Sequence, residues 1–224
     1  MNFDFLSNTM LFRGISAEEI QGMIGCLGAE QKRYSKGETI YRAGECVQSM
    51  GLVLSGSVQI ESDDPWGNKS ILDRVPPGAV FAETYACVPD EPMMVNAVAA
   101  EKSEVVFLHA ARLMHPCDTI CPGHRRLSAN LLRISAQKNL ILSRRIFHTT
   151  PKSIRGRLVS YLSFQAAREG SGDFTIPFNR QQLADYLSVD RSALSNELSK
   201  MQREGLLEVQ RSHFVVKKSE ILTE

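Results

Sequence analysis

The spacing of apolar residues changes along the chain, and this change limits the folds available to it. Between residues 30 and 110, short apolar runs such as 50–54 and 57–60 alternate with Gly, Pro and Asp. Many short strands at this spacing are typical of an all-β roll or sandwich. From 124 to 147, apolar residues recur at steps of three to seven, which predicts one long helix. We therefore expect an α+β chain, with an N-terminal antiparallel, jelly-roll-like β-roll, a long interdomain helix and a smaller C-terminal domain.

The composition is that of a soluble globular protein, with 43% hydrophobic and 23% charged residues. The sequence contains no apolar stretch of the roughly 18 residues that a membrane span needs, so no membrane partner is predicted. The N-terminus has no basic residues before an apolar run, and it is therefore not expected to be a secretory signal. The five cysteines are scattered and odd in number, which fits a reducing compartment. These features predict a cytoplasmic protein in which the isolated Cys26, Cys46 and Cys87 are small buried residues.

The predicted long helix has two possible partners for its apolar stripe. Leu127, Ile134 and Ile141 are seven residues apart, as on one seam of a coiled coil, whereas Lys138 and Arg145 interrupt the companion seam. The stripe can pack against its own β-roll or against a second copy of the helix. The length of the helix favours both contacts, one with its own β-roll and one with a second copy of the helix.

Local capping signals predict where the other helices begin. Ser16 and Glu19 form a capping box within a helix predicted over 12–25. Thr150 followed by Pro151 has the form of an N-cap and a first helical residue. We therefore place the domain boundary near 148–151, with a sensory domain over 1–123, a dimerisation helix over 124–148 and a C-terminal domain over 149–224.

The segment 179–216 has the pattern of a winged helix-turn-helix. Asn179 and Gln182 cap a first helix, and Asp190 is placed to cap a second helix three residues after the first ends. Leu194 and Leu198 would face the core. The opposite face of the second helix is polar, and its members are Arg191, Ser192, Ser195, Asn196 and Ser199. Two helices joined by so short a turn describe a helix-turn-helix, and the apolar runs after Gly205 predict a two-stranded wing with a basic tip at 211–213.

The polar face has side chains suited to reading base edges in the major groove of DNA. Arg can bond guanine in bidentate fashion, Asn can bond adenine, and Ser can bond several bases. Arg180 and Gln181, at the start of the first helix, are placed to contact phosphate. Residues 144–224 have 13 basic against 9 acidic residues, whereas 1–143 have 13 against 16, so a polyanion is expected at the C-terminal end. The alternative is a helical hairpin whose polar face meets only solvent.

The order and spacing of several segments resemble the CRP/FNR family of bacterial transcription regulators over essentially the whole chain. The N-terminal matches are the glycine turns 36–40, 43–45, 54–58 and 77–81, and the C-terminal matches are 180–187, 190–195 and 204–207. The resemblance implies a cyclic-nucleotide-binding-type β-roll that responds to an effector. It also implies a homodimer joined through the long helix, which reads a two-fold operator in double-stranded DNA.

The effector pocket departs from the pattern of the cyclic-AMP-binding members. Those members have a Gly-Glu turn, whose Glu holds the ribose, and an Arg-Ser pair about ten residues later, whose Arg pairs with the cyclic phosphate. Here the turn is Ala82-Glu83, and Met93 and Met94 align with the Arg-Ser pair. A partly buried phosphate needs a charge-assisted partner, which methionine cannot supply. We therefore expect no ordinary cyclic AMP binding. The candidate effector-pocket residues are Glu83, Thr84, Met93, Met94 and Val95, and Glu83 has a structural hydrogen bond as its alternative role.

A second group of residues could sense a metal, haem or redox state. Soft Cys and His ligands at close spacing can hold zinc or haem iron, and paired thiols can switch redox state. The group lies just before the long helix and consists of His115, Cys117, Cys121 and His124. Its alternative is a Pro-rich connection with chance Cys and His. The iron–sulfur-binding members have a cysteine cluster near the N-terminus, and no cysteine precedes Cys26, so a cluster of that type is not expected.

Two other classes of function compete with a DNA-binding regulator. A metal-dependent enzyme built on a β-roll would need a His-x-His pair, and the five histidines include none. Neither a G-x-S-x-G elbow nor a Walker loop occurs, so the chain is not expected to be an enzyme. The other alternative is an effector-binding module that does not bind DNA, against which the polar face argues. The sequence does not decide whether RNA polymerase is a partner. It also does not identify the effector.

Overall fold

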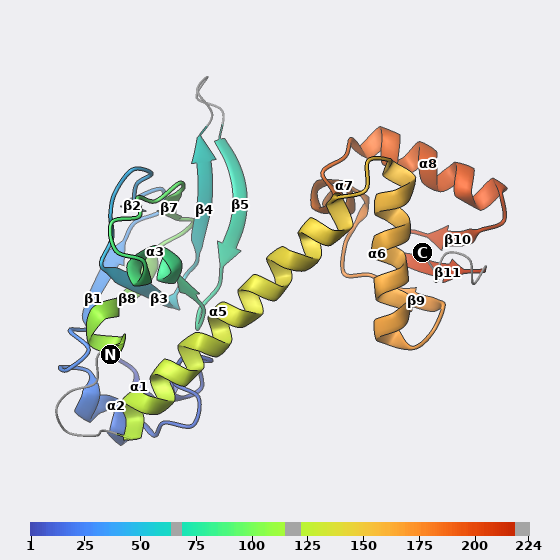
Figure 1. The fold of residues 1–224 in the computed structure, drawn as a ribbon. Coiled ribbons are helices and arrows are strands. Elements are labelled where there is room, and N and C mark those ends of the chain that lie inside the picture. Colours follow the sequence, from blue (N-terminus) through green and yellow to red (C-terminus); the bar gives the residue numbers. More distant parts are fainter. Residues whose placement is uncertain (64–68, 115–121, 218–224) are drawn as a thin grey trace. The chain divides into compact units, whose positions relative to one another are not determined.

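The computed structural model describes residues 1–63, 69–114 and 122–217 (Figure 1). By its contacts the chain divides into two compact units, Met1–Ala136 and Gln137–Glu224, which are described separately below. The division falls inside α5 (Pro122–Thr149), so each unit includes part of that helix. The architecture is α+β, as the sequence predicts. The predicted limits of the sensory domain, the dimerisation helix and the DNA-binding domain stay a prediction.

The first unit contains two antiparallel sheets of four strands each. One has the order β1-β8-β3-β6 and the other β2-β7-β4-β5. Their bounds are β1 Glu30–Tyr34, β2 Thr39–Tyr41, β3 Ser49–Ser55, β4 Val58–Asp63, β5 Lys69–Val75, β6 Val80–Phe81, β7 Asn96–Ala99 and β8 Ser103–His109. The helices of this unit are α1 Phe3–Ser7, α2 Ala17–Met23, α3 Glu83–Cys87, α4 Ala110–Met114 and the N-terminal part of α5. The predicted antiparallel β-roll is confirmed.

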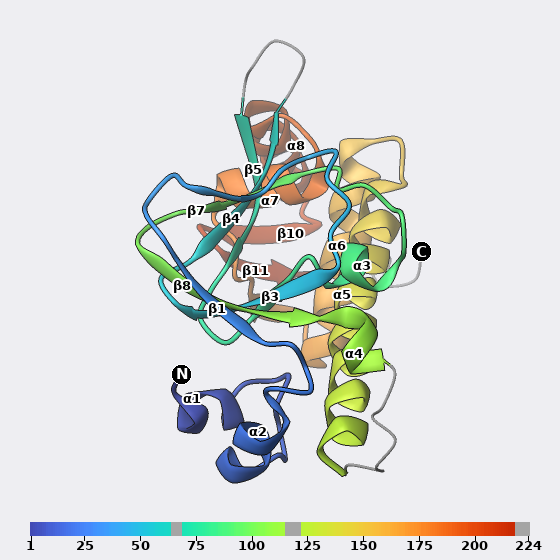
Figure 2. The ribbon, with the colours of Figure 1, turned by 90° about the vertical axis from the view of Figure 1, so that its left-hand side faces the viewer.

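The sheet containing β3 and β8 is buried on both faces, which explains its continuous apolar sequence. Side chains alternate between the faces of a strand. Val53 and Phe107 point into the roll and join the core between the two sheets. Met50, Leu52 and Leu108 point outward into a second core, which α1, α2 and α5 cover. Figure 2 shows α1 and α2 lying beneath this sheet.

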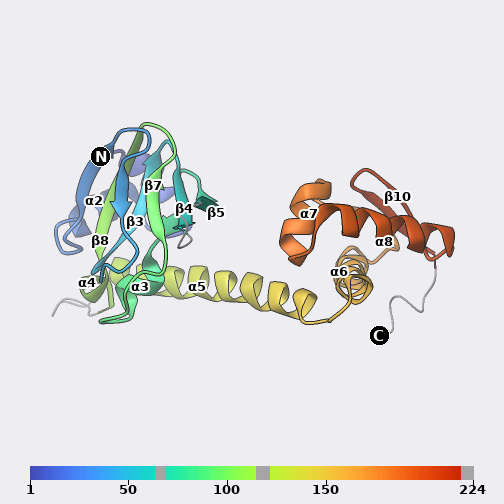
Figure 3. The same cartoon turned by 90° about the horizontal axis from the view of Figure 1, so that it is seen from above.

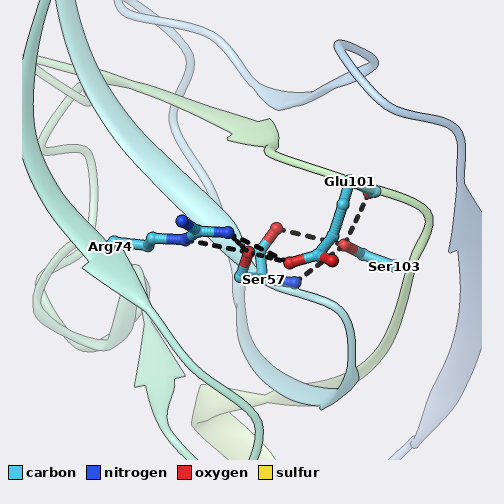
Figure 4. Close-up of polar contacts among 4 residues, drawn as sticks. All are labelled: Ser57, Arg74, Glu101 and Ser103. Carbon is cyan, nitrogen blue, oxygen red and sulfur yellow. Dashed lines mark hydrogen bonds and ion pairs between the residues drawn. The ribbon is translucent and has the colours of Figure 1, made fainter.

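The turn between β3 and β4 is held by a polar cluster of four side chains (Figure 4). Ser57 Oγ donates to Glu101 Oε1 at 2.6 Å and accepts from Arg74 Nη2 at 2.9 Å. The Ser57 amide donates to Ser103 Oγ at 3.1 Å. The preceding Gly56 has φ +74°, and an added Cβ would lie 2.4 Å from the Lys102 carbonyl oxygen. A glycine is required here because the chain both turns left-handed and passes close to the β7–β8 turn.

Only the first part of the long helix packs against the β-roll. Leu127, Leu131 and Ile134 are buried in the outer core, and the Asn130 side-chain amide donates to the Leu11 and Arg13 carbonyls at 3.0 and 2.8 Å. Two partners were open for the stripe of Leu127, Ile134 and Ile141, and packing against the chain's own β-roll is confirmed for part of it. Two of its members are covered by the chain itself, whereas Ile141 is 59% exposed.

The second unit is a helical domain with a small antiparallel sheet of order β10-β11-β9. Its elements are the end of α5, α6 Ile154–Glu169, β9 Asp173–Thr175, α7 Arg180–Leu187, α8 Arg191–Arg203, β10 Leu207–Gln210 and β11 His213–Val216. Figure 3 shows α6 nearly end-on, with α8 crossing it. The two predicted wing strands are present, and β9 adds a third strand that the sequence analysis missed.

The start of α6 differs from the prediction. Its N-cap is Ser153, whose hydroxyl accepts from the Gly156 amide at 3.0 Å. Thr150 instead completes α5, since its amide and its hydroxyl both donate to the Ile146 carbonyl. The Pro151 carbonyl accepts a hydrogen bond from Arg157 Nε at 2.9 Å. The Thr-Pro pair therefore belongs to the connection between the two helices, where a contact from α6 holds it.

The predicted burial is wrong for Cys26 and Cys46, whereas Cys87 is partly buried against the outer core. Cys26 and Cys46 are exposed and Cys87 is half-buried. Cys26 follows α2 and Cys46 lies in the loop after β2, where neither reaches a core. Burial of a small residue depends on which neighbours the fold brings to it, and the local pattern contains no such information.

Candidate DNA-binding site

The helix-turn-helix is formed by α7 and α8, and local caps define both helices. The Asn179 carboxamide accepts from the Gln182 amide at 3.0 Å, while Gln182 Oε1 accepts from the Asn179 amide at 2.9 Å. Asp190 Oδ1 accepts from the Ser192 and Ala193 amides at 2.8 and 3.0 Å. The hydrogen bond from the Ser192 hydroxyl is the main reason that the pKa of Asp190 is lowered. Both caps agree with the sequence analysis.

Two arginines from outside the helix-turn-helix hold the end of α7. Arg157 Nη1 donates to the Leu187 and Ser188 carbonyls at 3.0 and 2.9 Å. Arg145 Nη2 donates to the Asp185 carbonyl at 3.1 Å. A cation at a helix C-terminus interacts favourably with the unpaired carbonyls there. These contacts support the turn into α8, and the sequence analysis missed them because each spans 30 or more residues.

A third arginine joins α6 to α8. Arg155 Nε lies 2.6 Å from Glu197 Oε1, and Arg155 Nη1 lies 2.8 Å from Glu204 Oε2. Hydrogen bonds from Arg155 lower the pKa of Glu204, and the two carboxylates raise the pKa of Arg155. Arg145, Arg155 and Arg157 therefore make contacts inside the unit. The basic excess of the C-terminal region is not all available to a polyanion.

Four of the five predicted base-reading residues lie on the face of α8 away from its buried side, and the fifth, Arg191, lies in the first turn of the helix. Leu194, Leu198 and Met201 are buried. The predicted residues are exposed except for Ser195, which is half-buried, and they are Arg191, Ser192, Ser195, Asn196 and Ser199. The outward orientation that the prediction requires is therefore present.

The three serines of this face already donate their hydroxyl protons within the helix. Ser192 Oγ donates to Asp190 Oδ1. Ser195 Oγ donates to the Arg191 carbonyl at 2.9 Å, and Ser199 Oγ donates to the Ser195 carbonyl at 3.0 Å. Within the described ranges, the side chains of Arg191 and Asn196 have no hydrogen bond or ion pair. These two keep all their donors for an external partner.

A surface hollow brings three arginines together. Arg180 from the start of α7, Arg191 from the start of α8 and Arg211 from the wing turn line it with Gln181. Among the residues that the structure describes, no carboxylate lines this hollow. Arg211 has φ +56°, at the tip of the hairpin between β10 and β11. The sequence predicted a basic wing tip, but only the fold brings Arg211 beside Arg180 and Arg191.

The predicted effector-pocket residues lie around α3 and the start of β7. Glu83 is the first residue of α3 and is buried, whereas Thr84 beside it is exposed. Met93 is 3% exposed and Met94 is 73% exposed, and Val95 is half-buried just before β7. Their grouping into one ligand site stays a prediction.

Ala82, just before Glu83, has an unusual backbone conformation that leads to a testable prediction. Its φ of +58° is left-handed, a region that costs an L-residue roughly 1–2 kcal/mol. We expect Ala82→Gly to raise the free energy of unfolding by about 0.5–1 kcal/mol, because glycine removes this strain. Urea denaturation of the full chain measures the change.

The control for this prediction is Ala129→Gly on an exposed position of α5. There glycine should lower the stability by about 1 kcal/mol, because the backbone is helical. Destabilisation by both substitutions would contradict the strain at Ala82.

The possible metal or redox group lies largely outside the described residues. His115, Cys117 and Cys121 fall in the segment that the structure does not describe, and His124 is buried near the start of α5. Across the described ranges, three or more His, Cys, Asp or Glu side chains nowhere gather as metal ligands would. A sensory role for this group stays a prediction.

Comparison with known proteins identifies the two units. Residues 31–119 match the cyclic nucleotide-binding domain family, and residues 156–224 match the Crp-like helix-turn-helix domain family. The chain belongs to the CRP/FNR family of transcription regulators. It is thus a DNA-binding regulator of a non-enzymatic family whose members are typically dimeric.

The relatives of this CRP/FNR-family chain are distant but cover most of its length. The "Cyclic AMP receptor protein" of Thermus thermophilus is 23% identical over 98% of this chain and 97% of its own. The "Transcriptional activator protein FnrA" of Stutzerimonas stutzeri is 26% identical over 78% of this chain and 71% of its own. Among solved structures, OCPA-complexed CprK is 13% identical with a TM-score of 0.59, covering 90% of this chain and 92% of that one. None of the described helices is both long and apolar enough to cross a membrane.

Proposed function

We propose that Arg191 and Asn196 read bases directly in the major groove of an operator. Their support is that they alone among the five predicted residues keep all their side-chain donors unused within the described structure. Arg bonds guanine N7 and O6 with two donors, and Asn bonds adenine with one donor and one acceptor. The serines have already donated their protons, so each is left to accept a hydrogen bond from a base amino group.

Arg180, Gln181 and Arg211 contact phosphate in this proposal. They lie beside Arg191 in a hollow that has no carboxylate among its described lining residues, and such a positive surface suits the DNA backbone. Selection of bound duplexes from a random pool, followed by fluorescence anisotropy, tests the proposal. We expect a two-fold sequence with half-sites about 34 Å apart, bound at least a thousandfold more tightly than unrelated duplex. Equal affinity for all duplexes would contradict it.

The homodimer is proposed to form through a face of α5 that the β-roll does not cover. Its exposed apolar residues include Leu132, Leu142 and Ile146. Together with Ser135 and Asn139 they are spaced by alternating steps of three and four, which is the repeat of a coiled-coil seam. This seam replaces the one that includes Leu127 and Ile134, since the β-roll already covers those residues.

The effector is proposed to be something other than cyclic AMP bound in the usual manner. Met93 and Met94 lie where the cyclic-AMP-binding members have Arg and Ser, and neither provides a positive charge for a phosphate. Isothermal titration calorimetry with cyclic AMP should show no binding in the micromolar range. The operator affinity should also be unchanged by cyclic AMP. Micromolar binding with tighter DNA affinity would make this a cyclic-AMP receptor after all.

A metal-, haem- or redox-sensing role remains the second candidate for regulation. It depends on Cys117, Cys121 and the nearby histidines. Metal analysis and an absorbance spectrum of the purified protein test it, and a protein free of metal and haem would leave only the thiols.

A further inference from the structure

One cavity of the first unit has neither an α3 residue nor a predicted effector-pocket residue among its described lining residues. It opens where β1, β2, β3 and β8 meet α4, and its volume is about 420 Å³. Pockets of roughly 300–1,000 Å³ are typical of small-molecule sites. Its wall is aromatic, because Phe107 packs edge-to-face against Tyr34 and Tyr41 with ring centroids 6.3 and 5.7 Å apart.

Arg112, at the rim of this cavity, lacks a partner in the protein. Its side chain is exposed, and its guanidinium has no carboxylate or hydrogen-bond partner within the described ranges. It lies against Gly28, where an added Cβ would come 3.0 Å from Arg112 Nη1. His109 also lines the cavity, but its Nδ1 is closed off from solvent and so does not face the open space.

The charge of the lining indicates the class of that partner. Lys32 Nζ pairs with Glu30 Oε2 at 3.4 Å, so the charges of Lys32 and Glu30 offset each other. Lys32 Nζ also lies 5.5 Å from the Phe107 ring centre. The positive charge of Arg112 has no counter-charge among the described residues of the lining. A planar guanidinium forms paired hydrogen bonds with a carboxylate, and the aromatic wall suits a flat apolar body.

We propose that this cavity binds a small aromatic carboxylate. The carboxylate pairs with Arg112 at the rim, and the ring lies against Tyr34, Tyr41 and Phe107, with His109 in the same lining. Neither Glu83 nor Met93 is among the described residues that line this site.

The cavity is linked to α5 by direct contacts within the same unit. Arg112 belongs to α4, and the next residue, Leu113, is buried in the core that also contains Leu127 of α5. The Ser128 hydroxyl of α5 donates to the Leu113 carbonyl at 3.0 Å. A ligand held by Arg112 would therefore act on the helix that we propose as the dimer seam. Only this regulatory consequence rests on the proposed function; binding itself does not.

Calorimetry and NMR of the full chain test the site. The probes are benzoate, 4-hydroxybenzoate and cinnamate, with benzamide as the uncharged counterpart of benzoate. We expect at least one carboxylate to bind at millimolar concentration or below and to shift the His109 ring resonances. Arg112→Gln should weaken that binding at least about tenfold, as loss of a charge-assisted pair predicts. Arg13→Gln, the same change at an exposed arginine outside the cavity, should leave it unchanged.

Three results would overturn the inference: no probe shifts His109, Arg112→Gln binds as tightly as the unmodified chain, or benzamide binds as well as benzoate. Operator binding measured on the same samples separates the two proposals. Intact DNA binding without carboxylate binding refutes the cavity site alone, and carboxylate binding without specific DNA binding refutes the proposed function alone.

Discussion

Ile146→Asp should convert the protein to a monomer and lower its operator affinity by more than a hundredfold. Ile146 is 66% exposed and lies on the proposed seam with Leu132, Asn139 and Leu142. In a dimer, two aspartates would face each other across an apolar contact, where like charges are strongly unfavourable. A monomer reaches only one half-site and loses the high effective concentration of its second recognition helix. Analytical ultracentrifugation gives the mass, and fluorescence anisotropy gives the affinity.

The matched control is Ile141→Asp. Ile141 has a similar exposure of 59%, but at 3.6 residues per turn it lies roughly 140° around the helix from Ile146. It should stay dimeric and bind DNA normally. If Ile141→Asp dissociates the dimer while Ile146→Asp does not, the seam is on the face that continues from Leu127 and Ile134.

Asn139 refines the same expectation. A polar residue at a central core position of a coiled coil fixes register and oligomeric state at a cost in stability. Asn139 occupies such a position between Leu132 and Ile146. The dimer should therefore be in-register and parallel, which brings the two α8 helices into a two-fold relation.

Arg191→Ala should weaken operator binding by about 1–3 kcal/mol for each half-site, which is roughly five- to 150-fold. The reason is that Arg191 has free donors at the N-terminal end of α8, the end of a recognition helix that reaches base edges. The base preference should be lost at one position in each half-site and kept elsewhere. Anisotropy with operators changed one base pair at a time measures both effects.

Arg203→Ala is the control for the change in charge. Arg203 is exposed at the other end of α8, so its loss removes the same charge without touching the proposed base-reading end. It should leave the base preferences unchanged. A uniform loss of affinity for every sequence by Arg191→Ala would instead make Arg191 a phosphate contact, and the salt dependence of binding would fall by about one ion.

Features of the fold follow from the sequence where the governing contacts are local. The capping boxes of Ser16 with Glu19 and of Asn179 with Gln182 are present, as is the Asp190 cap. Each joins residues three or fewer apart, so the pattern contains both partners. The predicted start of α6 at Thr150-Pro151 is wrong for the opposite reason. Thr150 bonds back to Ile146 of α5, and the Pro151 carbonyl accepts from Arg157, so this pair does not cap α6.

The sequence by itself determined the strand-rich N-terminal part, the two wing strands, the long helix, the helix-turn-helix and its exposed polar residues, because these follow from apolar periodicity and short-range capping. Only the tertiary structure decided which part of α5 is covered by the β-roll and which arginines are used internally. It also decided that Arg211 joins Arg180 and Arg191. These outcomes depend on pairs of residues separated by tens of positions. Such pairs come into contact only after folding. A single sequence does not indicate which of its many basic and apolar side chains will form these long-range contacts.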